Sequence, residues 1–411
     1  MKILFVVPYV PNLIRVRPYN LIRFLAGEGH EVTVATLVSN ELECQDVENL
    51  AQYCHQVHAF PLPKWRSLSN SLLAVPTSQP LQSVYCWTPE LADFMLNEIS
   101  TRSNGNGYDI VHIEHLRGAR YGLFLKKKLA GRGKQPPIVW DSVDSITHLF
   151  RQSSSHSKSF FGRWVTTFEL SRTERFERAM LDAFERVLVT STIDKDALLS
   201  LAPENGANGV VKVLPNGVDL DYFHPNEEVE REPATLIVSG KMSYHANVTM
   251  VLHLVQNIMP AIWEQKPDVK LLIVGKDPVS EIQALAENPA IEVTGTVPDI
   301  RPYLRSATLA LTPVVYGAGI QNKVLEAMAT GTPVVSTPLA VSALDVVSGQ
   351  DIEVAQNPLE FARKVVYLLQ HPEIRQRIGD AGLAYVQNNH KWSVIAERLE
   401  GIYHEVSENH N

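Results

Sequence analysis

The stretch TLALTPVVYGAGIQNKVLEAMATGTPVVS, residues 308–336, decides the fold class of this chain. An apolar run over 308–315 has the length of a buried strand, and two glycines mark a turn after it. A helical pattern begins near Gln321, and Pro333 starts a second apolar run. Free N–H groups and the positive end of the helix dipole make such a turn a site for a phosphate or diphosphate, although similar turns also occur without a ligand.

The same alternation of short apolar strands and helical segments occurs twice along the chain. It predicts parallel sheets that are covered by helices on both faces. Turn residues at 214–219 separate the two series, so we expect two doubly wound α/β domains of similar size, residues 1–215 and 216–389, and a final amphipathic helix. The predicted strands are 3–7, 31–36, 110–113, 138–140, 187–190, 235–239, 270–274, 290–293, 308–315 and 333–336.

The composition of the 411 residues excludes several classes of protein. Acidic residues outnumber basic ones by 45 to 37, and this net charge of -8 argues against a general nucleic-acid binder. Three cysteines without a CxxC pair indicate reduced thiols rather than a disulfide framework or a metal site. No apolar run is long enough for a membrane span, and the short first run resembles a strand more than a signal peptide. We therefore expect a cytoplasmic protein.

In open parallel sheets, ligands bind beyond the carboxyl ends of the strands, so two facing domains suit a reaction of two substrates. In the stretch that decides the fold, Lys323 adds a positive charge to the first helical turn. Glu326 follows about one turn later, and its carboxylate can accept two hydrogen bonds from a ribose diol. The chain has neither a GxGxxG fingerprint nor a P-loop.

The segment KVLEAMATGTPVV, residues 323–335, resembles the signature of the retaining GT-B glycosyltransferases of family 4, also called glycosyl transferases group 1. Further segments resemble the family in the same order, at 29–34, 109–112, 214–219, 272–275 and 294–297. The resemblance implies a GT-B fold, in which two Rossmann-like domains face a cleft. It assigns the acceptor to residues 1–215, with a helix of about 390–411 packing back on them, and the nucleotide-sugar donor to residues 216–389.

The activity that this resemblance implies is transfer of a sugar from a nucleotide-diphosphate sugar to a hydroxyl of a glycan, a lipid-linked glycan or a small molecule, with retention of configuration. We expect no metal and no other cofactor. No DxD motif of the metal-dependent type stands in a plausible loop: Asp219 and Asp221 match DxD only as letters and belong to the turn between the domains. The sequence also shows no cluster of His and Cys ligands. A sugar-nucleotide 2-epimerase of the same fold and a non-catalytic nucleotide-sugar binding protein are the alternatives.

The resemblance assigns donor contacts to individual positions of the second domain. Glu326 matches the second of two family glutamates and is implied to bind the ribose, whereas the first glutamate falls at Ala318. That contact is then left to the backbone of the turn or to a side chain at the helix start. Donor-binding candidates are therefore Gly319, Ile320, Gln321, Asn322, Lys323 and Glu326, together with Val297 in the preceding loop.

The family also holds the diphosphate with a Gly-Arg-Leu segment and a later lysine. Gly240 and Lys241 stand at the first two of these positions, so Lys241 supplies a charge but no bidentate fork. The later lysine falls near Ala246. A solvated loop lysine is the alternative for Lys241.

In the first domain, the loop after the first strand carries Arg15 and Arg17. It is similar to the Arg-x-Arg loop of a branch associated with exopolysaccharide synthesis, in which two arginines at a helix start could reach the donor diphosphate or an anionic acceptor. They could equally pair with surface carboxylates. Glu114 and His115 end the third strand and are the candidates for the active-site side chain that orients the donor sugar, while His112 within the strand suits a structural histidine.

The acceptor leaves a weaker trace in the sequence. Trp65 to Leu68, Lys126 to Lys128 and Arg132 to Lys134 together suggest a basic, partly aromatic surface for an anionic lipid at the inner face of the cell membrane. A solvated charged face explains the same runs. We expect residues 64–90 and 150–166 to form loops over the acceptor.

Overall fold

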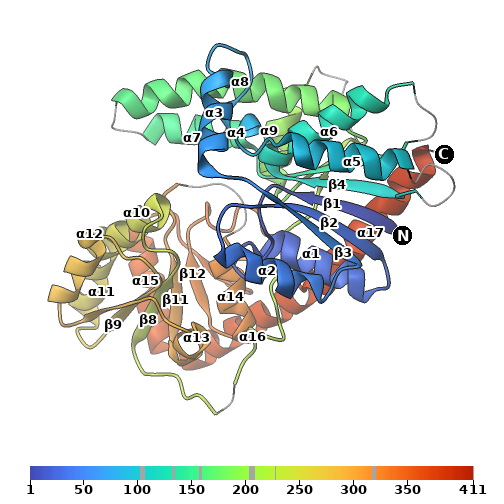
Figure 1. Cartoon of the computed structure of the whole chain (residues 1–411). Coiled ribbons are helices and arrows are strands. Elements are labelled where there is room, and N and C mark those ends of the chain that lie inside the picture. The colour runs from blue at the N-terminus through green and yellow to red at the C-terminus, as the bar shows by residue number, and fades with distance from the viewer. Residues whose placement is uncertain are drawn as a thin grey trace. The chain divides into compact units, whose positions relative to one another are not determined.

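The computed structural model describes residues 1–101, 107–131, 135–156, 160–202, 209–226, 228–316 and 321–410, without the side chains of 153–156 and 160–167. The chain divides into two compact units (Figure 1). Unit 1 comprises Met1–Pro215 and Ile395–Asn411, and unit 2 comprises Asn216–Val394. The prediction of two doubly wound parallel sheets is confirmed.

Unit 1 contains a parallel sheet of seven strands in the order β3-β2-β1-β4-β5-β6-β7. Strand β1 at its centre is apolar from Ile3 to Val7 and fully buried there, because helices cover both faces of the sheet. Figure 1 shows α5 and α6 on one face of this sheet and α1 and α2 on the other. The strands are β1 (Lys2–Val7), β2 (Glu31–Val38), β3 (Gln56–Pro61), β4 (Ile110–Glu114), β5 (Ile138–Val143), β6 (Arg186–Val189) and β7 (Val211–Val213).

The order of the strands reverses between β1 and β4, which are neighbours with Ile3 opposite Ile110. Such a switch point leaves a crevice beyond the carboxyl ends of the two strands. The segments that leave these ends are the loop before α1 and the start of α6. The helices of unit 1 around the sheet are α1 (Val16–Gly27), α2 (Leu42–Ala51), α5 (Pro89–Thr101), α6 (His115–Leu129), α9 (Thr192–Leu199) and α17 (Trp392–His410).

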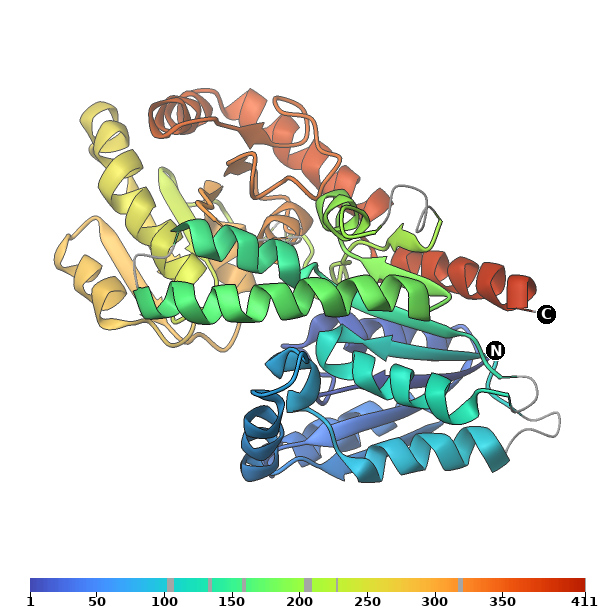
Figure 2. The ribbon, with the colours of Figure 1, turned by 90° about the horizontal axis from the view of Figure 1, so that it is seen from above.

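The last helix, α17, packs against unit 1. Tyr403 is fully buried there, and its hydroxyl lies 2.8 Å from Nδ1 of His112 on β4. Both views place the end of α17 close to the N-terminus of the chain (Figures 1 and 2). The helix begins at Trp392, two residues later than the sequence pattern predicts.

Two segments that the sequence predicts to be loops are helical instead. Residues 64–90 form α3 (Lys64–Ala74), α4 (Leu81–Tyr85) and the start of α5, and the described part of 150–166 belongs to α7 (Ile146–His156) and α8 (Phe160–Ala183). Arg172 of α8 fixes the turn between α3 and α4, because its guanidinium donates to the carbonyl oxygens of Val75 (2.6 Å) and Gln79 (3.2 Å). Partners more than 90 residues away leave no local sequence pattern.

Unit 2 contains a parallel sheet of six strands in the order β10-β9-β8-β11-β12-β13, and its order reverses between β8 and β11. Buried apolar clusters cover both faces of the sheet. The strands are β8 (Thr235–Ser239), β9 (Lys270–Val274), β10 (Ile291–Gly295), β11 (Leu309–Thr312), β12 (Val334–Ser336) and β13 (Glu353–Val354). Its helices include α10 (His245–His253), α11 (Met259–Gln265), α12 (Ser280–Gln283), α13 (Arg301–Ser306), α14 (Asn322–Ala329), α15 (Pro358–Gln370) and α16 (Pro372–Asn389).

Candidate functional site

Glu114 ends β4 at the switch point of unit 1, and its side chain is 2% exposed. The hydroxyl of Tyr9, in the loop after β1, donates to Oε1 of Glu114 at 2.9 Å. Burial, and then the charge of Asp141, raises the pKa of Glu114 to about 8. The carboxyl group is therefore mostly protonated at neutral pH and can donate a hydrogen bond, which an ordinary glutamate cannot.

His115 begins α6 directly after Glu114 and has a φ of 65°. This left-handed conformation is strained for a residue other than glycine, and such strain is concentrated at functional sites. The backbone N–H of Arg117 donates to Nδ1 of His115 at 3.3 Å. Burial, followed by Arg117, lowers the pKa of His115 to about 4, so the ring is neutral. The accepting Nδ1 leaves the proton on Nε2, which can donate to a ligand.

Arg17 belongs to a buried network behind this site. Its Nε lies 2.8 Å from Oδ2 of Asp141 on β5, and the two side chains are 4% and 0% exposed. The same carboxylate oxygen lies 3.8 Å from Nε2 of His112, whose other nitrogen contacts Tyr403. Burial lowers the pKa of His112 to about 4. The structure thus places Arg17 against a buried carboxylate, where the sequence offered a surface carboxylate as the alternative, and His112 in the core.

Arg15 lies on the other side of Tyr9. Its guanidinium carbon is 4.8 Å from the centre of the Tyr9 ring, and NH1 donates to Val10 O and to Glu43 Oε1 at 3.1 and 3.2 Å. The side chain is 36% exposed, so it remains accessible from solvent. Arg15 is therefore the arginine of the first loop that can meet a ligand.

Tyr9 and Asp141 complete this site and were missed in the sequence. Each comes directly after or near the end of an apolar strand, Tyr9 two residues after Val7 and Asp141 after Trp140. A polar residue at the carboxyl end of a parallel strand is the signal that could have found them.

In unit 2, Gly240 follows β8 at the switch point, and Gly275 follows β9, the other neighbour of β8. A Cβ on Gly275 would lie 1.7 Å from the carbonyl oxygen of Gly240, and the φ of Gly275 is 155°. The two loops can approach this closely only because glycine stands at this position. Lys241, next in the chain, is 54% exposed, and its Nζ lies 3.9 Å from Oδ2 of the equally exposed Asp277. A pair of this kind contributes little to stability, so its charge is free to meet an anion.

Lys323 occupies the first turn of α14, and its Nζ donates to Oδ1 of Asn247 at 2.5 Å. The amide nitrogen of Asn247 donates to Lys241 O at 3.0 Å, so one side chain ties both lysine segments together. The position of the later family lysine is taken by Ala246, whose side chain is buried. Lys323 reaches Asn247, the next residue in the chain, from α14 and brings a cation to that position.

Glu326 lies one turn after Lys323 and is half-buried. Its carboxylate makes no hydrogen bond or ion pair with any residue of the ranges that the structure describes. Burial raises the pKa of Glu326 to about 7 while Lys323 opposes the rise, and burial lowers the pKa of Lys323 to about 8. An incompletely solvated carboxylate without a partner is suited to accept hydrogen bonds from a ligand.

The remaining donor-binding candidates surround the start of α14. Oδ1 of Asn322 accepts from Nδ2 of Asn216 at 3.3 Å, and Gln321 is the N-cap residue without a side-chain capping bond. Gly319 and Ile320 lie outside the described residues. Val297 packs against the apolar cluster that includes Val324 and Leu325.

One contact beside these residues had no signal in the sequence. Nδ1 of His245, at the start of α10, lies 2.5 Å from the hydroxyl of Tyr316, and the two rings are nearly parallel at 11°. Tyr316 follows β11 and His245 follows β8, so the pair links the two strands of the switch point beyond their ends.

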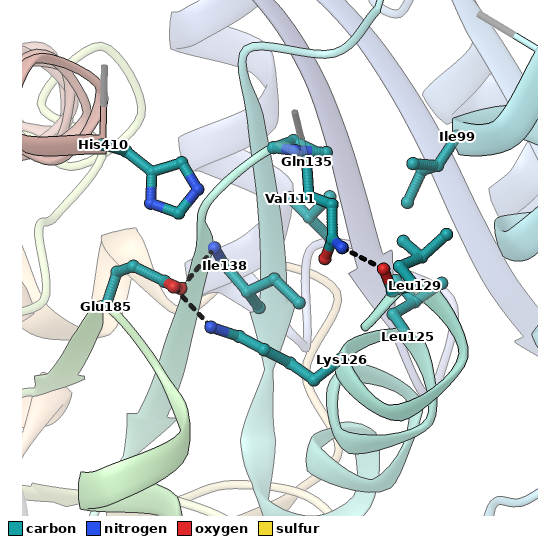
Figure 3. A pocket seen from close by; sticks show the side chains of 10 residues that line it. Ile99, Val111, Leu125, Lys126, Leu129, Gln135, Ile138, Glu185 and His410 are labelled. Atoms are coloured by element: carbon teal, nitrogen blue, oxygen red, sulfur yellow. Dashed lines mark hydrogen bonds and ion pairs between the residues drawn. The ribbon is translucent and has the colours of Figure 1, made fainter. Parts of the chain in front are cut away.

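The lysine run of α6 does not join Trp65 in one surface, and that prediction is wrong. Helix α6 starts at the carboxyl end of β4 and runs antiparallel to the strands. Its last turn therefore lies at the amino-terminal edge of the sheet, beside Ile138, the first residue of β5 (Figure 3). There Lys126 pairs with Glu185, whose other oxygen accepts from Ile138 N at 2.8 Å. The pocket around them holds only about 20 Å³, room for a water molecule. Helix α3, with Trp65, starts beyond the opposite end of β3.

The charged run Arg132 to Lys134 lies outside the described residues. Within the described residues, no group of three His, Cys, Asp or Glu side chains could hold a metal ion. Among the described helices, none is both long and apolar enough to cross a bilayer.

Two family models match the chain. "Glycosyltransferase Family 4" covers residues 15–222, and "Glycosyl transferases group 1" covers residues 233–371. The phosphatidyl-myo-inositol mannosyltransferase of Mycobacterium tuberculosis is 27% identical over 268 residues, which is 60% of this chain and 68% of that protein. An uncharacterised 44.6 kDa protein of the cps region of Klebsiella pneumoniae is 20% identical over 90% of both chains.

Solved structures share the fold. The Anabaena protein HepE in complex with UDP and glucose superposes with a TM-score of 0.68 at 14% identity, over 98% of this chain and 100% of that chain. A sucrose-phosphate synthase of Thermosynechococcus elongatus gives 0.66 at 18% identity, over 99% of both chains. These likenesses extend over both units and agree with the expected GT-B fold.

Proposed function

The chain belongs to glycosyltransferase family 4, and from that premise we propose that it transfers a hexose from a nucleotide-diphosphate sugar to a hydroxyl acceptor with retention of configuration and without a metal ion. The observation that carries the proposal is the arrangement around α14. Asn247 links the side chain of Lys323 to the backbone of Lys241, and Lys323 precedes Glu326 by one turn. The carboxylate of Glu326 has no hydrogen-bond partner among the described residues. Cations for a diphosphate and an acceptor of hydrogen bonds for a ribose are what a nucleotide-sugar requires.

In the proposed reaction, the bond between C1 of the sugar and the diphosphate oxygen breaks, and the electron pair stays with the diphosphate. The acceptor oxygen bonds to C1 on the same face, and its proton passes to the departing phosphate oxygen. Lys241 and Lys323 stabilise the charge that develops on the diphosphate. These cations favour the transition state because the additional negative charge on the diphosphate appears only as the bond to C1 breaks.

We assign the orienting role to unit 1. Nε2 of His115 donates a hydrogen bond to a sugar hydroxyl, and the protonated Glu114 provides a second donor beside it. Tyr9 and the strained turn at His115 hold both groups in place before the substrate arrives. A general base is not needed, since the leaving phosphate takes the proton.

The donor experiment uses thermal unfolding with UDP-glucose, GDP-mannose and ADP-glucose. A ligand that binds only the folded chain raises the melting temperature, so one nucleotide series should stabilise the protein. Nucleotide release with a panel of glycan and lipid-linked acceptors, with and without EDTA, then tests transfer and metal independence. Stabilisation by none of the donors would contradict the proposal, and conversion of the donor to its 2-epimer without an acceptor would instead indicate an epimerase.

The acceptor side of the proposal includes peripheral contact with the inner face of the cell membrane, and α3 supports it. Trp65, Leu68 and Leu72 follow one another at helical spacing and are 65%, 62% and 63% exposed. Of the two basic residues beside this stripe, Arg66 pairs with Glu90, with NH1 and Oε2 2.5 Å apart, so Lys64 is the cation that is left to meet an anionic lipid surface.

Sedimentation with phosphatidylcholine vesicles that contain phosphatidylglycerol tests the membrane contact. We expect binding that salt weakens and that Trp65→Ala with Leu72→Ala reduces, whereas Leu359→Ala on α15, equally exposed at 60%, leaves it unchanged. Equal binding by all three proteins would refute the role of α3.

A further inference from the structure

Unit 1 contains a pocket of about 410 Å³ that no step of the proposed reaction uses. This volume falls in the range of about 300–1,000 Å³ that is typical of small-molecule sites. The pocket opens between the loop after β1, the start of α1 and the outer side of α2 with the turn that follows it. It is lined by Pro11, Asn12, Leu13, Ile14, Tyr19, Asp46, Asn49, Gln52 and Tyr53.

The apolar part of the lining consists of aromatic rings and exposed aliphatic side chains. The rings of Tyr19 and Tyr53 meet edge to face, with centroids 6.1 Å apart and an interplanar angle of 87°. Leu13 and Ile14 are 75% and 72% exposed, and Tyr53 is 42% exposed. Apolar side chains kept in water at the rim of a pocket indicate a ligand that covers them. The C–H faces of a sugar ring are suited to lie against such rings.

The polar part of the lining consists of groups that both donate and accept hydrogen bonds. The amides of Asn49 and Gln52 are exposed and make no hydrogen bond to another residue in the described ranges. Each amide offers an N–H₂ and a carbonyl oxygen, which match the donor and acceptor of one sugar hydroxyl.

The loop that forms one wall of the pocket is held in shape by its own hydrogen bonds. The side-chain amide of Asn12 makes three of these bonds. Its Nδ2 donates to Oδ2 of Asp46 at 2.7 Å, and its Oδ1 accepts from the backbone N–H groups of Ile14 and Arg15, both at 2.9 Å. The position of the wall therefore does not depend on a ligand, which lowers the entropic cost of binding.

The charge of the lining selects among ligands. Asp46 is the only acidic residue in it, and no Lys, Arg or His belongs to it. Arg23, outside the lining, has its guanidinium carbon 5.9 Å from the centre of the Tyr53 ring. The lining itself offers a phosphate or an acidic sugar a carboxylate and no cation, so it favours neutral ligands over anions. Neutral hydroxyl groups fit this environment.

The loop also connects the pocket to the candidate active site. While Leu13 and Ile14 face the pocket, Arg15 of the same loop stacks on Tyr9, which donates to Glu114. We propose that this pocket is a subsite for a neutral carbohydrate portion of the acceptor, an assignment that rests on the proposed transferase function. A glycan held there lies against the same loop that supports Glu114.

The test is ligand-observed saturation-transfer NMR on the full chain with maltotriose, cellotriose and α-1,6-mannotriose. We expect at least one of them to bind with a Kd of about 1 mM, and Tyr53→Ala to weaken this binding at least tenfold, about 1.4 kcal/mol. Tyr367→Ala on α15 is the matched control, because Tyr367 is 44% exposed and remote in the sequence. The Tyr367→Ala variant should bind the same trisaccharide with the affinity of the wild type.

The outcomes separate this inference from the proposed function. Failure of all three probes to bind the wild type at about 10 mM, or equal binding by the Tyr53→Ala variant, would overturn the subsite. The melting-temperature shift with nucleotide-sugars should be the same in Tyr53→Ala as in the wild type. Glycan binding that depends on Tyr53 in a protein that binds no nucleotide-sugar would uphold the subsite and refute the transferase.

Discussion

The two switch points of the molecule differ in how their charged groups are satisfied. In unit 1, Arg17 is paired with Asp141 and Glu114 accepts from Tyr9, so each group has a partner within the fold. In unit 2, Lys241 is half exposed and Glu326 has no hydrogen-bond partner among the described residues. The first arrangement fixes positions in advance, whereas the second retains charges for a ligand. Substitutions should therefore affect stability in unit 1 and ligand binding in unit 2.

The largest effect is expected for Arg17→Met, which leaves Asp141 buried without its cation. Removing one member of a buried pair costs about 3–5 kcal/mol. Urea unfolding should show this loss. Arg15→Met is the control, because the pair of Arg15 with Glu43 is 36% and 13% exposed and its loss should cost less than about 1 kcal/mol. Equal losses in the two variants would show that burial does not distinguish the arginines.

An intermediate effect is expected for Glu114→Gln. The pKa of Glu114 is raised to about 8 in the folded chain, so the wild type loses stability as the pH rises from about 4.5 through 8. The variant lacks this loss and should be more stable than the wild type by about 1–3 kcal/mol at pH 8, with a smaller difference at pH 5. Urea unfolding at both pH values measures it. A constant difference would mean that Glu114 does not titrate in this range.

The smallest effect is expected for Lys241→Ala. Loss of an exposed cation should leave the unfolding free energy within about 0.5 kcal/mol of the wild type. It should lower kcat about tenfold, since one charge on the departing diphosphate is lost. Lys270→Ala, at the amino end of β9, removes an exposed lysine from the opposite edge of the same sheet and should change neither quantity. Wild-type kcat in Lys241→Ala would refute the role of Lys241.

Local pattern predicted much of the fold and part of the site. Residues 235–239 and 270–274 each contain a run of three or four apolar residues, and the structure has β8 and β9 at these bounds. Residues 64–90 were wrongly predicted to be a loop because Arg172, which holds their turn, lies far along the chain.

The interactions within the site were beyond the reach of local pattern. The sequence showed Lys323 and Glu326 as one helical turn, but their link to Lys241 depends on Asn247, 76 residues before Lys323. Arg17 was identified as a charge, whereas its burial against Asp141 follows from the pairing of β5 with its neighbours in the sheet.

Calorimetric titration of the wild type and of Glu326→Gln with the nucleotide-sugar that stabilises the protein tests the central claim most directly. We expect wild-type affinity to be greatest between about pH 7 and 8, where Glu326 is ionised and Lys323 is still charged, and to fall on both sides. Glu326→Gln should bind about 100-fold more weakly at pH 7.5 and lose the acidic limb. Glu287→Gln, at an exposed position, should behave as the wild type. Undiminished affinity in Glu326→Gln would contradict the account.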